Sequence, residues 1–202
     1  MTAAHCQKLP SRVTVYAGSV DKFNGGERYT VETFLAHPSY DSSSISWDYG
    51  IIKLADQLNF GNTNIAPIAI PSFESSDAQF TGAGHTSGWG YIYYEAQSDP
   101  DNELPNMLRY ADISILSDTQ CTNYWGTSYQ SESMICAGGG ALSNQGVCMG
   151  DSGGPLVQEI NGVKTLVGAT SWAPSSCTTK LPCGWAKLST VRTWIINNTD
   201  LQ

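Results

Sequence analysis

The chain has 202 residues, 41% hydrophobic and 14% charged, with 20 glycines and 9 prolines that punctuate short segments, as in a globular protein of one or two small units. Its formal net charge is −8 with only 10 Lys and Arg residues, which argues against nucleic acid or an anionic membrane as a partner, because phosphates are bound mainly through cations. It contains no apolar run of about 20 residues that could span a membrane.

The segments are short and mostly strand-like in the first third of the chain. Residues 13–17, 29–35 and 49–54 alternate or run apolar, and turn clusters such as Asn24-Gly25-Gly26 and 41–44 separate them. We expect these segments to belong to one β-unit.

A second set of strands is expected around 87–90 and over 109–116, 134–137, 155–158, 166–172 and 185–188. A helix is expected only near the end, over about 190–197, where Val191, Trp194 and Ile195 form an apolar face. The polar run 95–103 is expected to be an exposed loop.

The segment Gly150-Asp151-Ser152-Gly153-Gly154 has the composition of a loop that holds a nucleophile. A serine hydroxyl is a weak nucleophile, so it needs a base for its proton and N–H groups for the oxyanion. Glycine permits positive φ, so the N–H groups of Gly150 and Ser152 can point into one small cavity. Taken alone, the motif also fits a glycine-rich turn before a strand.

Two further motifs complete a possible triad. His5 lies in Ala3-Ala4-His5-Cys6, and Asp48 precedes the apolar run Ile51-Ile52-Lys53-Leu54. Each alone could be an ordinary surface residue. Their order of His, Asp and Ser is that of one serine-protease class. An acid just before a buried strand is well placed to accept the second N–H of the histidine.

With these motifs the chain resembles the chymotrypsin-like serine endopeptidases over nearly all of its length. Ser171-Trp172 matches the strand that binds the substrate backbone, and Val191 with Trp194-Ile195 matches the terminal helix. The resemblance implies an all-β fold of two antiparallel Greek-key six-stranded barrels and a C-terminal α-helix. Residues 1–78 would be the remainder of the first barrel, 79–188 the second barrel, and 189–202 the helix and tail.

The resemblance assigns catalysis to His5, Asp48 and Ser152, and the oxyanion hole to Gly150 and Ser152. It also implies the disulfides Cys121–Cys136 and Cys148–Cys177, hence an oxidising compartment and secretion. In the family Cys6 would pair with an upstream cysteine, and Cys183 has no family partner. A Cys6–Cys183 bridge is possible by counting, but bridged Cα atoms lie within about 7 Å, so we expect both cysteines to be unpaired.

The substrate pocket implied by the alignment comprises Gly146, Met149, Ser171, Trp172, Ala173 and Cys183. Gly146, six residues before Ser152, replaces the aspartate of trypsin-like members, so an Arg or Lys side chain would be buried without a counter-charge. Ala173 and Cys183 replace the glycines of open pockets. We expect a preference for small or medium apolar P1 residues, as in elastases; a chymotrypsin-like preference is second, since Ala173 is small and Met149 can move.

No metal and no cofactor are expected. The stretch that matches the calcium loop of the family offers Ser19-Val20-Asp21-Lys22 with only Glu27 beyond. His37, which precedes Pro38, and His85, in a glycine-rich run, are expected to be structural or solvated.

Family members carry a few dozen residues before the histidine motif, which begin at an Ile-Val-Gly-Gly-like terminus exposed by zymogen cleavage. Its ammonium pairs with the aspartate before the serine, here Asp151. Met1 stands close to His5, so we expect this chain alone not to turn over peptides.

Three hypotheses of different class follow. The first is a secreted, monomeric serine endopeptidase acting on peptides or proteins, with protein protease inhibitors as further partners. The second is a non-catalytic homologue that acts as a binding or regulatory module, and the third is a shortened product without function. The intact triad and oxyanion positions favour the enzyme over the binding module, which has no physical need of them.

Overall fold

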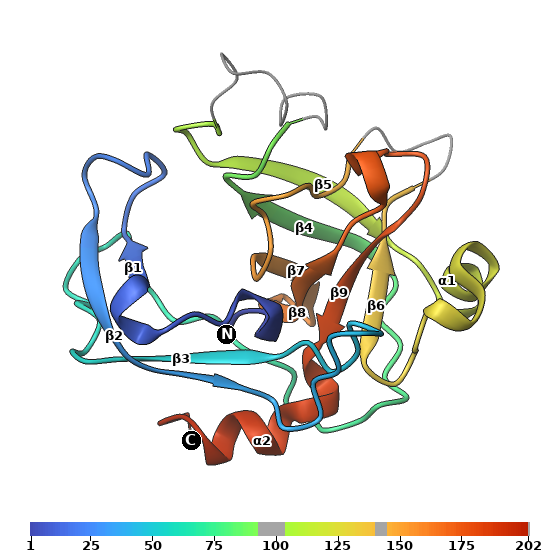
Figure 1. The fold of residues 1–202 in the computed structure, drawn as a ribbon, viewed down its shortest axis with the longest axis horizontal. Coiled ribbons are helices and arrows are strands. Elements are labelled where there is room, and N and C mark those ends of the chain that lie inside the picture. The colour runs from blue at the N-terminus through green and yellow to red at the C-terminus, as the bar shows by residue number, and fades with distance from the viewer. Residues whose placement is uncertain (93–103, 140–144, 202) are drawn as a thin grey trace.

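The structure is a computed structural model that describes residues 1–92, 104–139 and 145–201 (Figure 1). The first third of the chain forms a three-stranded antiparallel sheet in the order β1-β2-β3. Its strands are β1 (Thr14–Ala17), β2 (Glu27–Ala36) and β3 (Gly50–Leu54). The predicted loop 95–103 lies outside the described residues.

The rest of the chain forms a closed barrel in the order β4-β5-β6-β9-β8-β7, whose neighbours all pair antiparallel. Its strands are β4 (Gly82–Gly88), β5 (Arg109–Ile115), β6 (Met134–Ala137), β7 (Pro155–Ile160), β8 (Val163–Trp172) and β9 (Cys183–Lys187). The prediction of an all-β fold with a C-terminal helix is confirmed.

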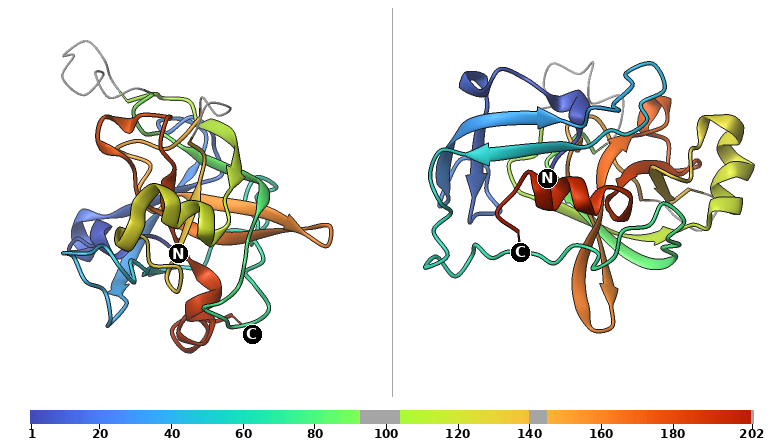
Figure 2. Two further views of the ribbon diagram at one scale, coloured as in Figure 1. Left: turned by 90° about the vertical axis from the view of Figure 1, so that its right-hand side faces the viewer. Right: turned by 90° about the horizontal axis from the view of Figure 1, so that it is seen from below.

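The C-terminal helix α2 (Arg192–Asn197) follows the 3-10 turn η6 (Leu188–Val191). Further 3-10 turns are η1 (Ala4–Cys6), η2 (Pro10–Arg12), η4 (Gly126–Ser128) and η5 (Ser175–Cys177). Figure 2 shows α2 on the outside of the molecule. Val191 and Ile195 bury its apolar side in a cluster with Tyr49 of the sheet side and Ala169 of the barrel.

The expectation of a helix only near the end is wrong, because a second helix, α1, spans Asp118–Trp125. A capping box starts it: the Ser117 side chain accepts the Gln120 N–H, and the Gln120 side chain accepts the Ser117 N–H. The helix buries little except Cys121. Its apolar periodicity is therefore weak, although the Ser-x-x-Gln cap was readable in the sequence.

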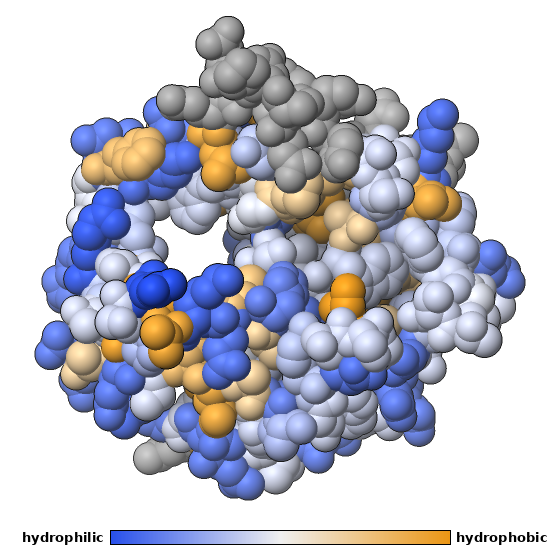
Figure 3. Space-filling view, viewed as in Figure 1, coloured by the Kyte–Doolittle hydropathy of each residue, from blue (hydrophilic) through white to orange (hydrophobic). Residues whose placement is uncertain are grey.

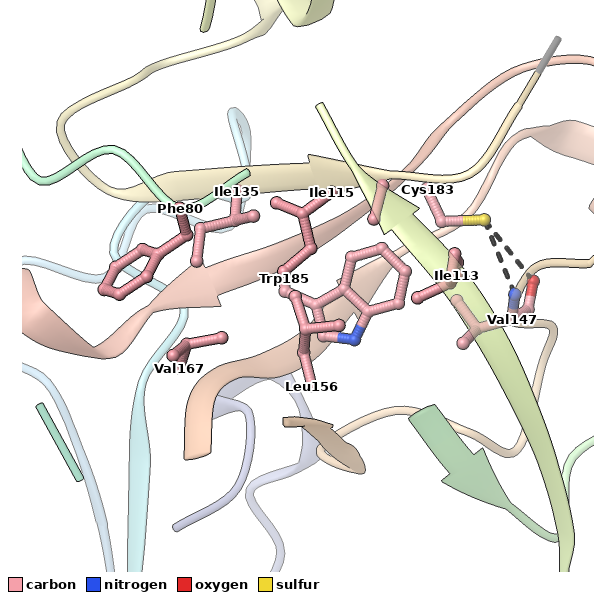
Figure 4. Packing of buried hydrophobic residues seen from close by; sticks show 10 residues of the cluster. Phe80, Ile113, Ile115, Ile135, Val147, Leu156, Val167, Cys183 and Trp185 are labelled. Atoms are coloured by element: carbon pink, nitrogen blue, oxygen red, sulfur yellow. Dashed lines mark hydrogen bonds between the residues drawn. The ribbon is translucent and has the colours of Figure 1, made fainter. Parts of the chain in front are cut away.

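The barrel contains the main core, in which Trp185 and Leu156 are fully buried (Figure 4). Tyr49 joins the sheet to the barrel, because its hydroxyl donates to the carbonyls of Ser133 and Lys187 at 3.0 and 2.9 Å. An opening remains between the two units on the face shown in Figure 3.

Candidate active site

The N-terminal segment places His5 against the edge of the sheet. Thr2 pairs with Gly50, the first residue of β3, through two backbone hydrogen bonds of 2.8 and 2.7 Å. Ala3 and Ala4 are buried, and the turn η1 begins at Ala4. Small side chains at these two positions allow the segment to pack closely, and His5 follows with its side chain 29% exposed.

Asp48 is a buried carboxylate, 1% exposed, that accepts three hydrogen bonds. Its Oδ1 accepts the backbone N–H of His5 at 2.8 Å. Its Oδ2 accepts from Nδ1 of His5 at 2.7 Å and from the hydroxyl of Ser171, on β8, at 2.6 Å. These donors offset the cost of burying the charge and fix the orientation of the imidazole.

The bond to Asp48 also sets the protonation of His5. It is the largest cause that raises the pKa of His5 from 6.5 to about 10, and a hydrogen bond with the Cys6 side chain is the second. This shift stabilises the imidazolium that forms when His5 takes a proton. A carboxylate only accepts, so Nδ1 keeps its proton in both forms of the ring, and when the imidazolium loses a proton Nε2 becomes the acceptor. His5 is thus oriented as a base that presents Nε2.

The loop before β7 holds Ser152 with two unused donors beside it. Gly150 adopts a φ of 97°, which only glycine takes readily. The N–H of Gly153 donates to the Thr170 carbonyl at 2.8 Å and pins the loop to β8. In the part of the chain that the structure describes, the N–H groups of Gly150 and Ser152 donate to no residue. They remain available for an oxyanion.

His5 and Ser152 line one cleft of about 420 Å³. Among the described residues no hydrogen bond joins the two side chains; such bonds often form only when the substrate is bound. Other residues of the wall are Tyr40, Ser42 and Ile45. Reasoning from the sequence missed these three, and the only signal for them was their position shortly before Asp48.

Asp151 points away from Ser152 and toward the segment after β4. Its carboxylate accepts the N–H of Gly90 at 2.8 Å and that of Cys148 at 2.9 Å. Burial raises the pKa of Asp151, and the two bonds oppose that shift. No cation lies within ion-pair distance of it in the described ranges. A second cavity, of about 260 Å³, opens beside it.

The structure separates the residues expected to line the substrate pocket. Met149, Ser171, Trp172 and Ala173 line the cleft of His5 and Ser152, whereas Gly146 lines the cavity beside Asp151.

Cys183 lines neither cavity and lies in the barrel core, 2% exposed. Its Sγ contacts the N–H and carbonyl of Val147 at 3.5 and 3.8 Å (Figure 4). A Cβ at Gly146 would stand 3.2 Å from that Sγ. Cys183 therefore fills the space beneath Gly146 and Val147, and its burial raises the pKa of the thiol to about 11.

Disulfides join Cys121 to Cys136 and Cys148 to Cys177, while Cys6 and Cys183 are free. The first disulfide ties α1 to β6. The second ties the nucleophile loop to the turn η5, which also lines the cleft. The second disulfide therefore joins two segments that line the candidate site.

Within the described ranges no group of three or more His, Cys, Asp and Glu side chains could hold a metal ion. The carboxylates of the stretch compared with a calcium loop already accept protein donors: Asp21 from Phe23 N–H and Asn24, and Glu27 from Tyr29, Asn59 and Asn62. No helix in the same part of the chain is long and apolar enough to cross a membrane.

The other two histidines lie away from the cleft. His37 packs between aromatic rings, with Trp47 stacked at 5.3 Å and Trp194 edge-on at 4.8 Å. His85 pairs with Asp112 across β4 and β5 at 2.6 Å, and both side chains are exposed.

Comparison with known proteins agrees with this geometry. A family profile described as Trypsin matches residues 1–195. The chain is 34% identical over 203 residues to Trypsin delta and to Trypsin gamma of Drosophila melanogaster, covering 98% of this chain and 74% of each relative. It is 34% identical over 202 residues to Trypsin beta of Drosophila erecta, with the same coverage. The chain belongs to the trypsin family of serine proteases.

Proposed function

We propose that this chain is an endopeptidase that cleaves peptide bonds through an acyl-enzyme on Ser152. The observation that carries the proposal is the buried Asp48 with three donors, which orients His5 toward the cleft that it shares with Ser152. A binding module has no need of an imidazole held in this way.

In this mechanism Nε2 of His5 takes the proton of Ser152 Oγ as Oγ forms a bond to the substrate carbonyl carbon. The N–H groups of Gly150 and Ser152 donate to the resulting oxyanion. The oxyanion collapses, the C–N bond breaks, and His5 gives its proton to the leaving amine. Water then attacks the ester with the same base and releases the acid, and Ser152 regains its proton.

The proposed P1 preference is for small or medium apolar residues. Gly146 offers no carboxylate to an Arg or Lys side chain, whose burial without a partner would cost several kcal/mol. Ala173 in the wall of the cleft supports a short pocket. In trypsin-like members the aspartate at this position binds basic P1 residues, so the preference proposed here differs from theirs.

Asp151 has the role of an activation residue in this proposal. A half-buried carboxylate with two N–H donors and no cation among the described residues is only partly compensated. A peptide ammonium in the adjacent cavity would pair with it and hold the oxyanion loop. Without that cation we infer that the chain has little activity.

The disulfides support an oxidising compartment, and we propose secretion on that basis. The partners in this proposal are peptide and protein substrates, together with protein inhibitors that enter the same cleft as substrates do. We propose that the enzyme acts as a monomer.

Labelling with a fluorophosphonate tests the nucleophile. The peptide Ile-Val-Gly-Gly is added to supply an ammonium to Asp151. We expect the probe to modify Ser152 and the Ser152→Ala variant to remain unlabelled, with kcat lower by several powers of ten. The control is Ser175→Ala, which removes another hydroxyl of the cleft and should still be labelled. Equal labelling of Ser152→Ala and the parent, or no labelling of either, would refute the proposal.

A further inference from the structure

The indole of Trp172 forms part of the cleft wall and is held from two sides. Trp172 pairs with Gly184 across β8 and β9, next to a register shift between Thr170 and Trp172. On the other side the Trp125 ring, at the end of α1, meets it edge-on at 5.0 Å and 78°. The position of this wall therefore depends on β9 and on α1.

At Gly184 the indole of Trp172 leaves no room for a side chain. A Cβ built there would fall under 3.0 Å from Cε2, Cζ2 and Nε1 of Trp172, a separation that real Cβ atoms essentially never show. Its φ is not in the left-handed region, so the backbone does not require glycine at this position. Glycine is needed because the indole lies directly on the backbone of β9.

Trp125 limits the directions in which the indole of Trp172 could be displaced. Helix α1 is tied to β6 by the Cys121–Cys136 disulfide, and Trp125 packs on the buried cluster of Cys121, Tyr129, Met134 and Cys136. The Trp125 Nε1 is itself buried without a hydrogen-bond partner in the described part of the chain. A densely packed neighbour yields little, so an indole pushed off β9 would move into the cleft.

We propose that Gly184 is a positioning residue for substrate specificity, which holds the Trp172 wall back and admits bulky apolar side chains at substrate positions before P1. This inference rests on the proposed function. Trp172 lines the cleft of His5 and Ser152 next to Ser171, and the resemblance of Ser171-Trp172 to the strand that binds the substrate backbone implies that its ring contacts residues on the N-terminal side of the cleaved bond. Any side chain at 184 would narrow that part of the cleft.

The test compares the parent chain with Gly184→Ala, in the presence of Ile-Val-Gly-Gly, on peptide amides that share one apolar P1 residue. The residues before P1 are either Ala or the bulky Leu and Phe. We define the ratio as kcat/KM for the bulky peptides divided by kcat/KM for the Ala peptide. In Gly184→Ala we expect this ratio to fall about tenfold, because KM for the bulky peptides rises. The kcat for the Ala peptide should stay unchanged. Gly84→Ala is the matched control, because its Cβ would meet Ile115 and Leu156 in the barrel; its ratio should equal that of the parent.

A double-mutant cycle separates this effect from a general loss of packing. In a Trp172→Phe background, where the shorter ring no longer reaches Gly184, adding Gly184→Ala should change the ratio less than twofold. An unchanged ratio in Gly184→Ala, or the same tenfold fall in both backgrounds, overturns the inference.

A readout without catalysis distinguishes failure of this inference from failure of the proposed function. Acrylamide quenching of tryptophan fluorescence should increase in Gly184→Ala as the indole of Trp172 becomes exposed, and the increase should vanish with Trp172→Phe. If no peptide is hydrolysed by any variant, the proposed function fails, while quenching still decides whether Gly184 holds the indole. Equal quenching in the parent and Gly184→Ala overturns the inference.

Discussion

We propose that Cys183, a buried side chain that lines neither cavity, limits the substrate pocket from beneath its wall. Its Sγ fills the barrel core beneath Gly146 and Val147. We expect Cys183→Gly to open this space and raise kcat/KM for Phe relative to Leu at P1 by about tenfold. The variant should also lose on the order of 2 kcal/mol of stability, from the cavity and the added backbone freedom.

Cys183→Ser is the matched control for that prediction, because it replaces only the sulfur with a smaller, polar oxygen and so opens far less space than Cys183→Gly. Its ratio of Phe to Leu should stay at the parent value even if it is less stable, since a ratio measured on one preparation does not depend on the folded fraction. If Cys183→Gly leaves the P1 profile unmoved, the space beneath Gly146 is not continuous with the pocket.

At the scale of elements, the strands were predictable and the helix α1 was not. The expected segments overlap all nine strands among the described ranges, and most were found as β-branched and aromatic runs, because burial against a core imposes a period that the sequence shows. The exception is β4, which spans Gly82–Gly88 where the strand was expected around 87–90, because its glycine-rich sequence has no such run. Helix α1 buries chiefly Cys121 and is held by a disulfide and a capping box. A helix held in this way needs no repeating apolar face, so its sequence shows no helical repeat of apolar residues.

The aromatic cluster around His37 joins α2 to the segment before Asp48 and gives a pH-dependent contribution to stability. Burial lowers the pKa of His37 below 6.5, and its Nδ1 accepts the Ser39 N–H at 3.1 Å. Well above pH 6.5 both folded and unfolded states are neutral at this residue. As the pH falls below that value, the unfolded chain binds the proton first, so this contribution to stability is lost.

We therefore expect the melting temperature of the parent to drop more between about pH 7.5 and about pH 5 than that of His37→Asn. Asn keeps an acceptor for the Ser39 N–H but does not titrate. His85→Asn, at an exposed ion pair, is the control and should not reduce the drop. Differential scanning calorimetry measures all three. An equal drop in parent and His37→Asn would contradict a buried, neutral His37.

At the scale of the whole molecule, the site depends on contacts between the sheet and the barrel. His5 and Asp48 come from the sheet side, and Ser152 and Ser171 from the barrel. Motifs could predict which residues meet at the candidate site, because each motif carries its own chemistry. They could not predict that Cys183 would point into the core or that Gly184 would support Trp172, because both depend on how two distant strands pack.

We propose that the state of Asp151 controls the alignment of the oxyanion loop in the barrel. With two N–H donors but no cation among the described residues, its carboxylate holds the loop of Gly150 less firmly than an ion pair would. A free ammonium that enters the adjacent cavity should complete the pair and align the Gly150 N–H. Since one oxyanion donor is worth about 10²–10³ in rate, we expect Ile-Val-Gly-Gly to raise kcat/KM for an apolar P1 substrate by that factor.

Two controls isolate the charge in that experiment. The N-acetylated peptide has the same side chains without the ammonium and should not activate. Asp151→Asn keeps one acceptor oxygen but no charge, and its rate should not respond to either peptide, because an amide cannot form the ion pair. Activation by the acetylated peptide, or full activity of the chain without any peptide, would show that the loop is held by something other than a cation on Asp151.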